Sequence, residues 1–399
     1  MNRWKIDLAV MWFCSFFVMG GMTMVIPFLP LYLQELGIDD PHKVAIWAGF
    51  IFAANFVTLF AFQPLWGKLA DRYGRKVMLL RSCFGMAIII ILMGFAQSAW
   101  QLLALRLING VVSGFNPAAV SLISASAPKE RMGFAMGTLQ SGVIAGTITG
   151  PLFGGLLADV VGFRPIFYMT GAILLVASLL VAVLVREKFD RKAAAALPQL
   201  SIFKGFGQLR AIPQLPALFT VTLIIQFALL STMPVLPLFI QQMHPDMTRL
   251  ALFAGLVGSV AGLSNMIAAP LLGRLADKIG AQRVLGFALL GATVTLIPQA
   301  FATTVWQLLA ARFMFGLFLG GIVPSVQSLI RRFTPDGMES RAFAFNSSFL
   351  SVGNLLGPII GGFASGLIGI PGVFLMSAAL MLVNAIWVYY FTRAIAKPS

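Results

Sequence analysis

Twelve stretches of about twenty mostly apolar residues follow one another along this sequence, and they restrict the fold more than any other feature. A helix needs about 20 such residues to cross the hydrocarbon core of a bilayer. Of the 399 residues, 59% are hydrophobic and only 10% are charged, which is too little charge for a water-soluble surface. We therefore expect an all-α membrane protein with twelve transmembrane helices. The expected spans are approximately 8–33, 44–65, 77–96, 100–123, 134–157, 165–185, 218–240, 250–272, 284–303, 306–330, 343–366 and 372–391.

The basic residues are distributed unevenly between the expected loops. Of the 28 Lys and Arg residues, 23 fall on one face of the membrane (Arg81 is counted among them), three fall on the other face, and Arg106 and Arg312 lie within spans. Because loops rich in Lys and Arg stay cytoplasmic during insertion, this pattern predicts that both termini are cytoplasmic. It also accounts for the net charge of +15 without a nucleic-acid partner.

The second half of the sequence repeats the first at an offset of 206–207 residues. Segment 67–74 (GKLADRYG) returns as 273–280 (GRLADKIG), and segment 100–106 (WQLLALR) returns as 306–312 (WQLLAAR). Six spans separate the copies, so both halves have the same orientation across the membrane. Parallel repeats of this kind place a binding site between two halves, near the middle of the bilayer.

The repeat divides the chain into three parts. We expect two parallel, pseudo-symmetric six-helix bundles at 1–186 and 216–399, joined by a basic cytoplasmic loop at 187–215. That loop is either a plain linker or the site of a short helix that lies on the membrane surface.

Four motifs resemble the major facilitator superfamily, and the resemblance covers nearly the whole chain. Segment 67–76 (GKLADRYGRK) is similar to the signature loop between that superfamily's second and third spans. Segment 146–155 (GTITGPLFGG) resembles the fifth-span motif of its drug/proton antiporter branch with twelve spans, and 26–30 (IPFLP) and 106–110 (RLING) resemble two further patterns of that branch. The resemblance implies a bacterial multidrug efflux transporter of the inner (plasma) membrane, a monomer that works by alternating access.

The signature loop supplies a candidate conformational latch. The resemblance implies that Asp71 contacts the start of the eleventh span and holds the cytoplasmic side closed, as a carboxylate stabilises the amino end of a helix. Gly67 and Gly74 would permit close approach and a tight turn.

The basic residues of the loop admit two interpretations. Arg72 and Arg75 either pair with Glu130 or anionic lipid headgroups, or they only set the topology. The second copy keeps Gly273 and Asp277 but lacks the basic pair after them. We therefore expect the second copy to form the weaker latch.

Glycines recur every four residues along the expected fifth span, which places them on one helix face. Such a face allows close contact between helix backbones. We expect it to slide against glycines of the eighth span, in the other half, and the alternative is ordinary packing within one half. The motif residues are Gly142, Gly146, Gly150, Pro151, Gly154 and Gly155.

Polar side chains within spans are the candidates for substrate binding or coupling. Arg106 and Arg312 each cost at least about 2.5–3.5 kcal/mol to insert, and they either bind substrate or hold bent helices through backbone carbonyls. Glu35 either approaches the mouth of a cavity or is a solvated helix end. The amides either line a wet cavity or tie helices together. They include Asn55, Asn109, Gln140, Gln226 and Asn346.

These features together predict a secondary active transporter that exports amphipathic drugs or other small toxic compounds in exchange for protons. No Asp or Glu falls inside an expected span, although Asp7, Glu35 and Asp71 come near. A carboxylate there would suit proton coupling and cationic drugs. The alternative is therefore an exporter of an anionic or polar metabolite, antibiotic or lipid that uses Arg106 and Arg312.

Other classes of protein lack the residues that they need. The sequence has no phosphate-binding loop and no clustered catalytic or metal-ligating set, so we expect neither an ATP-driven pump nor an enzyme, and no cofactor or metal. A receptor or scaffold is disfavoured because the loops are short. The expected partners are small-molecule substrates, protons and membrane lipids.

Overall fold

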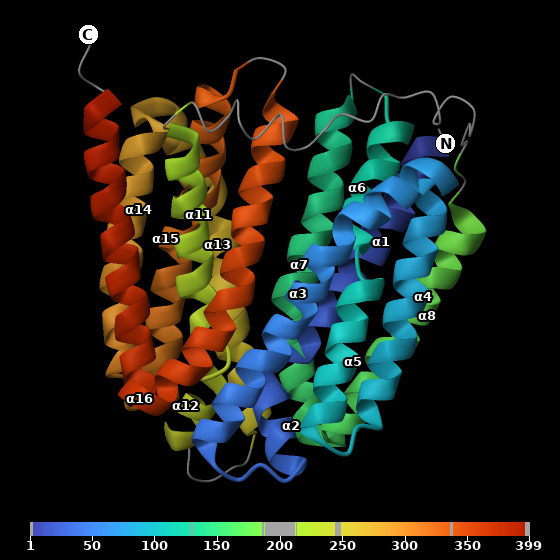
Figure 1. The fold of residues 1–399 in the computed structure, drawn as a ribbon, viewed down its shortest axis with the longest axis horizontal. Coiled ribbons are helices and arrows are strands. Elements are labelled where there is room, and N and C mark those ends of the chain that lie inside the picture. The colour runs from blue at the N-terminus through green and yellow to red at the C-terminus, as the bar shows by residue number, and fades with distance from the viewer. Residues whose placement is uncertain are drawn as a thin grey trace. The chain divides into compact units, whose positions relative to one another are not determined.

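The computed structural model describes residues 3–128, 131–185, 187, 212, 214–243, 249–335 and 338–395, and its regular elements there are helices (Figure 1). The elements that end before the central loop are α1 (Arg3–Met24), the 3-10 helix η1 (Ile26–Phe28), α2 (Leu29–Glu35), α3 (Pro41–Tyr73), α4 (Arg75–Gly94), α5 (Ala99–Val112), α6 (Phe115–Ser126), α7 (Met132–Val161) and α8 (Phe163–Leu184). Those after it are α11 (Gln214–Ser231), α12 (Leu236–Met243), α13 (Leu250–Ile279), α14 (Ala281–Ala300), α15 (Val305–Phe333) and α16 (Glu339–Ile395).

Eleven helical segments among the described residues are long and apolar enough to cross a membrane. The last of them covers 49 residues, Ala342–Tyr390, which is more than twice the length that one span requires. Its backbone leaves the helical conformation at Gly369, where φ is 72°, so α16 consists of two helices in sequence. The prediction of twelve spans is confirmed.

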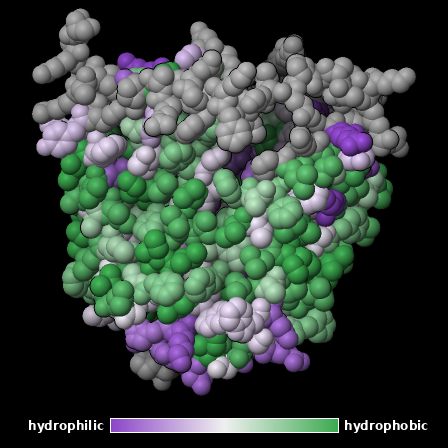
Figure 2. Space-filling view, viewed as in Figure 1, coloured by the Kyte–Doolittle hydropathy of each residue, from purple (hydrophilic) through white to green (hydrophobic). Residues whose placement is uncertain are grey.

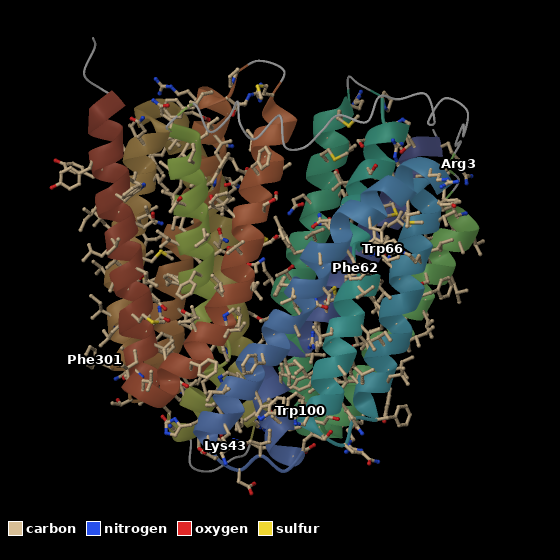
Figure 3. The ribbon with its side chains drawn as sticks, viewed as in Figure 1. Arg3, Lys43, Phe62, Trp66, Trp100 and Phe301 are labelled. Atoms are coloured by element: carbon tan, nitrogen blue, oxygen red, sulfur yellow. The ribbon has the colours of Figure 1, made fainter. Side chains whose placement is uncertain are left out.

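Large apolar side chains remain exposed along the helices. Leu367 is 87% exposed and Val160 is 75% exposed, and Figure 2 shows hydrophobic side chains over most of the visible helical surface. Trp100, which begins the first copy of the repeated WQLLA segment, is 70% exposed at a helix start (Figure 3). Trp306, which begins the second copy, is 67% exposed at the start of α15. Aromatic residues at helix ends are typical of the interface between lipid and water.

The repeated Trp-Gln segment forms the same helix start in both halves. Ser98 caps α5 by accepting a hydrogen bond from the N–H of Gln101 (3.3 Å), and Thr304 caps α15 by accepting one from the N–H of Gln307 (3.3 Å). In each copy the glutamine carboxamide oxygen accepts from the N–H of the residue before the cap. This arrangement is closely related to the capping box, and it explains why the glutamine recurs.

The described helices group into two compact units that each contain most of one sequence half. The first unit comprises 1–38, 54–198 and 248–259, and the second comprises 39–53, 199–247 and 260–399. The start of α13 therefore packs with the helices of the first repeat, and the start of α3 packs with those of the second. Residues 188–211, most of the predicted central loop, lie outside the described residues.

The four glycines spaced along α7 lie against the backbone of α1. A Cβ atom added to Gly142 would lie 2.7 Å from the carbonyl oxygen of Trp12, and Gly146, Gly150 and Gly154 meet α1 backbone in the same way. The expectation that this face contacts the eighth span is wrong. Because α1 occupies it, the four glycines belong to packing within the first half.

The second unit repeats this packing 207 residues later. Cβ atoms added to Gly353 and Gly357 of α16 would lie 2.7 and 2.8 Å from the carbonyl oxygens of Leu223 and Phe227 of α11. Gly361 likewise meets the backbone at Ser231. The repeat in the sequence therefore corresponds to backbone contacts at matching positions in the two units.

We predict that Gly146→Leu destabilises the first unit, because the new side chain meets the backbone of α1 at Phe16 and Gly20 and neither helix can yield. Overpacking of this kind costs about 1–3 kcal/mol. The thermal unfolding midpoint of the purified protein should fall. Gly137→Leu on the same helix is the control, since nothing lies within 4 Å of a Cβ atom there. Equal midpoints for the two variants would contradict the assignment.

Candidate functional site

The fourth span is broken within its apolar stretch. Helix α5 ends at Val112, Ser113 is extended (ψ 174°), and Gly114 has a φ of 123° before α6 begins. That φ favours glycine because other residues clash in this conformation. The break frees carbonyl groups in the last turn of α5, and inside a membrane these need partners from the protein.

Two polar side chains of α3 bond to α5, the first part of this broken span. The Asn109 carboxamide nitrogen donates to Oδ1 of Asn55 (2.8 Å), and both residues are almost fully buried. One turn further along α3, Thr58 donates to the carbonyl oxygen of Leu107 (2.7 Å). Gly110 lets the two helices meet at these positions, because a Cβ atom there would collide with α3. Asn55 and Asn109 therefore tie helices together.

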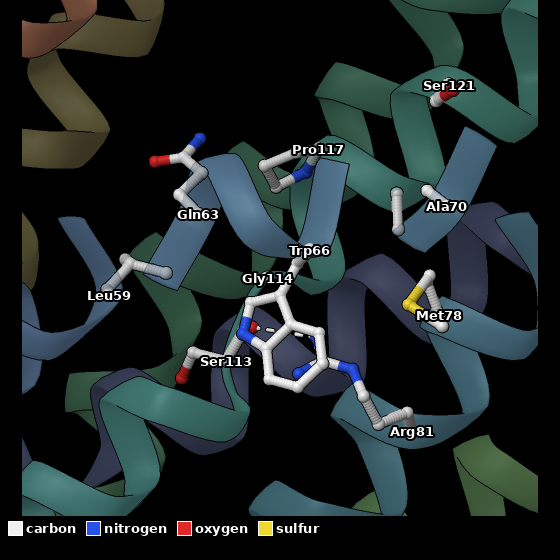
Figure 4. Close-up of a pocket in the computed structure, with 11 residues that line it drawn as sticks. Leu59, Gln63, Trp66, Ala70, Met78, Arg81, Ser113, Gly114, Pro117 and Ser121 are labelled. Atoms are coloured by element: carbon white, nitrogen blue, oxygen red, sulfur yellow. Dashed lines mark hydrogen bonds between the residues drawn. The ribbon is translucent and has the colours of Figure 1, made fainter. Parts of the chain in front are cut away.

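Trp66 and Arg81 serve the carbonyls at the break itself. Nε1 of Trp66 donates to the carbonyl oxygen of Val111 (2.7 Å), and Nη2 of Arg81 donates to that of Ser113 (3.1 Å). The Arg81 guanidinium carbon lies 3.5 Å from the centroid of the Trp66 ring, a close cation–π contact (Figure 4). Nε and Nη1 of Arg81 are buried and have no hydrogen-bond partner.

Arg81 lies within the third span, although the charge count from the sequence places it among the cytoplasmic bases. Helix α4 runs from Arg75 to Gly94, so Arg81 is in its second turn. The available signal was its position inside an apolar run, with Trp66 at the matching depth of the preceding helix. A charge count cannot distinguish a basic residue at a helix end from one that points into the protein.

The two arginines singled out from the sequence lie in different units. Arg312 of α15 is 6% exposed, and its Nη2 is 3.4 Å from the hydroxyl of Thr232. Arg106 of α5 is partly exposed. In both residues Nε is buried without a hydrogen-bond partner, so neither guanidinium is saturated by the described residues.

The remaining amide candidates differ in their surroundings. Oδ1 of Asn346 accepts a hydrogen bond from Thr222 (2.8 Å), which ties α16 to α11. Gln226 is half-buried and Gln140 is exposed. Glu35 is exposed at the end of α2.

A buried carboxylate lies near the start of the first span. Asp7 falls inside α1 and is 3% exposed, whereas the sequence placed it just outside the apolar run. Its Oδ1 is 3.9 Å from Nε of Arg3, whose Nη2 donates to the carbonyl oxygen of Leu184 (2.7 Å). Among the described residues, no group of three or more His, Cys, Asp or Glu side chains is arranged to hold a metal ion.

A second carboxylate, that of Asp159, joins the end of α7 to the start of α13 through hydrogen bonds. Asp159 accepts hydrogen bonds from the backbone N–H groups of Ala251 (3.1 Å) and Leu252 (2.8 Å). A carboxylate at a helix amino terminus is stabilised by the unpaired N–H groups and by the helix dipole. Nothing in the sequence distinguished Asp159 from other loop acids except its place one turn after Gly155.

One to two turns before Asp159 along α7, the two helices meet through backbone atoms. Gly155 lies against the backbone at Ala251, and Gly255 lies against the carbonyl group of Pro151. The interface expected between the fifth and eighth spans therefore exists. Pro151 and Gly155 form it, and the glycines on the neighbouring face of α7 do not.

The second unit contains the matching contact between α3 and α16. Gly362 lies against the backbone at Ala45, and Gly49 lies against the carbonyl group of Pro358. The counterpart of Asp159 is Gly366, so this contact has no carboxylate at that position. The N–H of His42, at the start of α3, instead bonds the nearby Asp40 carboxylate (3.0 Å).

Glycines turn the chain at both copies of the signature loop. Gly74 and Gly280 each have a φ of 98°, immediately before α4 and α14. In the first copy, the Glu187 carboxylate accepts from the N–H groups of Arg75 (3.0 Å) and Lys76 (2.8 Å). Glu187 thus caps α4, a role that the sequence did not suggest.

The predicted latch contact of Asp71 stays untested. Asp71 and Gly67 lie in the last turns of α3, but the Asp71 side chain and the surroundings of Gly67 are outside what the structure describes, as is Glu130. Arg72 is exposed and its guanidinium lies 5.4 Å from the Tyr73 ring. In the second copy Asp277 is exposed, and nothing lies within 4 Å of a Cβ atom built on Gly273.

The two halves contain repeated sets of membrane-spanning helices that contact one another through backbone atoms. Together with buried arginines whose N–H donors are unpaired, this arrangement is that of a multi-pass membrane transporter. The chain belongs to the major facilitator superfamily, whose sequence model matches residues 11–263 and 250–399. It is 40% identical over 388 residues to multidrug resistance protein MdtG of Serratia proteamaculans, covering 97% of this chain and 94% of that protein. It is 39% identical over 393 residues to MdtG of Proteus mirabilis, covering 98% and 97%.

Solved structures share the fold at low sequence identity. A bacterial homologue of the human lysosomal transporter Spinster has a TM-score of 0.80 at 16% identity, covering 98% of each chain. The nucleoside transporter NupG has a TM-score of 0.78 at 15% identity, covering 97% of this chain and 99% of that one. These likenesses confirm the predicted fold of two six-helix bundles.

We predict that Asp159→Asn loosens the contact between α7 and α13, because a neutral amide replaces charge-assisted hydrogen bonds worth about 1.5–3 kcal/mol. A cysteine placed at Gly258 would report the opening, since a Cβ atom built there lies 3.7 Å from the Cβ atom of Pro151 at this interface. Its reaction with a maleimide should become roughly tenfold faster. Cys14 and Cys83 are buried and give little background. Asp39→Asn is the control, and an equal effect of both variants would exclude a special role for Asp159.

Proposed function

We propose that this protein is a secondary active exporter of small amphipathic drugs and other toxic compounds in the bacterial inner membrane, with both termini cytoplasmic. It would work as a monomer by alternating access, with 1–186 and 216–399 as the moving halves and 187–215 as their connection. The identity of about 40% to proteins named multidrug resistance protein supports this substrate class.

One observation carries the alternating-access proposal. The contacts of α7 with α13 and of α3 with α16 occur at equivalent positions, and each joins a helix of one repeat to a helix of the other. Both are made largely by glycine and backbone atoms. Surfaces without interlocked side chains can separate and meet again without repacking a core, which is what a transporter gate requires.

The opposite ends of the helices would be controlled by the signature loops. Asp71, with Gly67, Arg72 and Arg75 around it, is proposed as the stronger cytoplasmic latch. The fixed turn at Gly74 and the capping of α4 by Glu187 support a defined loop conformation in the first copy. Gly273 and Asp277 would form the weaker latch.

Substrate binding is assigned to the polar groups within spans. Arg106 and Arg312 hold unpaired buried Nε atoms, and Gln140, Gln226 and Glu35 stay in the candidate set with them. Asn55, Asn109 and Asn346 already bond other helices through their carboxamides. Protons are the proposed counter-ion, and buried Asp7 is the carboxylate on which coupling would depend. The two unsaturated arginines also favour the second candidate function, export of an anionic or polar metabolite, antibiotic or lipid.

We predict that an imposed pH gradient drives efflux of a cationic dye from proteoliposomes that contain this protein, and that collapsing the gradient stops it. An anionic drug tested in parallel distinguishes the two candidate functions. Arg106→Ala should reduce transport, most strongly for the anion. If a pH gradient drives neither compound, the proposed mechanism is wrong. If the cation moves and Arg106→Ala changes nothing, Arg106 is not part of the substrate site.

We predict that Asp71→Asn reduces transport more than Asp277→Asn at equal expression, because only the first copy retains the basic residues and the Glu187 cap around its turn. Initial efflux rates in the same proteoliposomes measure the difference. Equal losses in the two variants would show that the latch is symmetric.

A further inference from the structure

A pocket of about 240 Å³ opens beside the broken fourth span, within the first compact unit (Figure 4). Its walls come from one face of α3 (Leu59, Gln63 and Trp66), from Arg81 of α4, and from the start of α6 including Ser121. Trp66 lies eight residues before the Gly74 turn, and Arg81 lies seven residues after it. At 1.5 Å per residue this places the pocket roughly 10 Å inside the helices from that end.

The lining combines an apolar body with one cation. Leu59, Trp66 and their neighbours supply carbon surface, while Gln63 and Ser121 add polar side chains. The Trp66 ring covers one face of the Arg81 guanidinium and orients it. Such a surface matches a small ligand with a flat apolar part and one negative group, since guanidinium pairs with oxyanions through two parallel N–H donors.

Arg81 has binding capacity that the described residues do not use. Its Nη2 bonds the Ser113 carbonyl, while Nε and Nη1 are buried without partners. Unpaired buried donors are rare in proteins and point to a ligand, ion or water that completes the site. Nη2 carries two hydrogens, so with one bonded to Ser113 a two-donor edge of the guanidinium is still unpaired.

The second half of the chain has no equivalent of this charge. At the offset of 206, Leu272 stands in place of Trp66 and Phe287 in place of Arg81. Phe287 packs edge-on against Phe318, with ring centroids 5.6 Å apart. The corresponding span, α15, is a single helix through this region. Packing of the fold at this depth is therefore possible without an arginine, and the first half carries one at the usual cost of an intramembrane charge.

We propose that this pocket, named here the Arg81 pocket, binds the anionic group of a small amphipathic molecule, with Arg81 as its ion-pair partner and Trp66 as its stacking surface. The occupant has one carboxylate or sulfonate on an aromatic body; an anionic lipid headgroup offers the same chemistry from the bilayer. The inference deepens the proposed export function, because it assigns a subsite for anionic substrates to residues outside the candidate set.

The test uses full-length protein in nanodiscs of zwitterionic lipid, with empty nanodiscs subtracted. Three tritiated probes of equal shape are compared: naphthalene-2-sulfonate, its neutral sulfonamide and 2-naphthylmethylammonium. We expect the sulfonate to bind most tightly. Arg81→Gln should weaken its binding roughly tenfold or more, the loss expected for a charge-assisted hydrogen bond. Arg283→Gln is the control, since Arg283 is an exposed arginine near the start of α14.

A second measurement keeps the test informative if Arg81→Gln does not fold. In otherwise unchanged protein, Ser121→Cys places a thiol in the pocket lining, while both native cysteines are buried. The sulfonate should slow alkylation of this thiol, and the ammonium probe should not. Equal binding of the three probes, or no protection of the thiol by the sulfonate, would overturn the proposal.

Lipid composition identifies the source of the anion. Replacing part of the zwitterionic lipid by phosphatidylglycerol should leave sulfonate binding unchanged if the pocket takes a soluble amphiphile, and competition that depends on Arg81 would assign it to a lipid headgroup. The dye efflux assay separates this inference from the proposed function. Export of dye without sulfonate binding would refute only the Arg81 pocket, and sulfonate binding without export would refute only the export function.

Discussion

Inside a bilayer every backbone N–H and C=O group must find its partner within the protein, because no water is present to serve as one. This requirement makes each span a helix, and it makes any interruption costly. At Ser113 and Gly114 the fourth span is interrupted, and the freed carbonyls are bonded by Trp66 and Arg81 from neighbouring helices. The same residues line a pocket. One set of side chains therefore both bonds the free carbonyl groups of the interrupted helix and forms a potential binding surface.

Close helix contact is the second way in which the backbone shapes this protein. Helix α7 uses two adjacent faces differently: the glycines spaced from Gly142 to Gly154 fix it to α1, while Pro151 and Gly155 bring it against α13. A contact within the first repeat and a contact between repeats are thus one residue apart in register. Asp159 adds a charge to the contact of α7 with α13 and not to that of α7 with α1. In the equivalent contact of α3 with α16, Gly366 stands in place of Asp159, so the two contacts between repeats are unequal.

Much of the architecture can be predicted from the sequence, because the spans and helix starts depend on local chemistry. Apolar length predicts the twelve spans, and the repeated WQLLA segment predicts a repeated helix start that the caps at Ser98 and Thr304 explain. The residues that were misjudged are those whose role depends on direction. In the sequence, Arg81 looks like a basic loop residue and Asp159 looks like a solvated acid. In the structure, both bond backbone groups of other segments.

The sequence by itself determined that this chain crosses a membrane, that it does so as two parallel repeats, and that charge is scarce enough for each buried arginine to matter. Hydropathy and spacing are properties of the linear chain, so no folding is needed to read them. Only the tertiary structure decided which helix each glycine face meets, and which carbonyls Arg81 and Trp66 serve. Those partners are between about 30 and more than 200 residues away along the chain, and their pairing follows from helix packing, which local patterns do not encode.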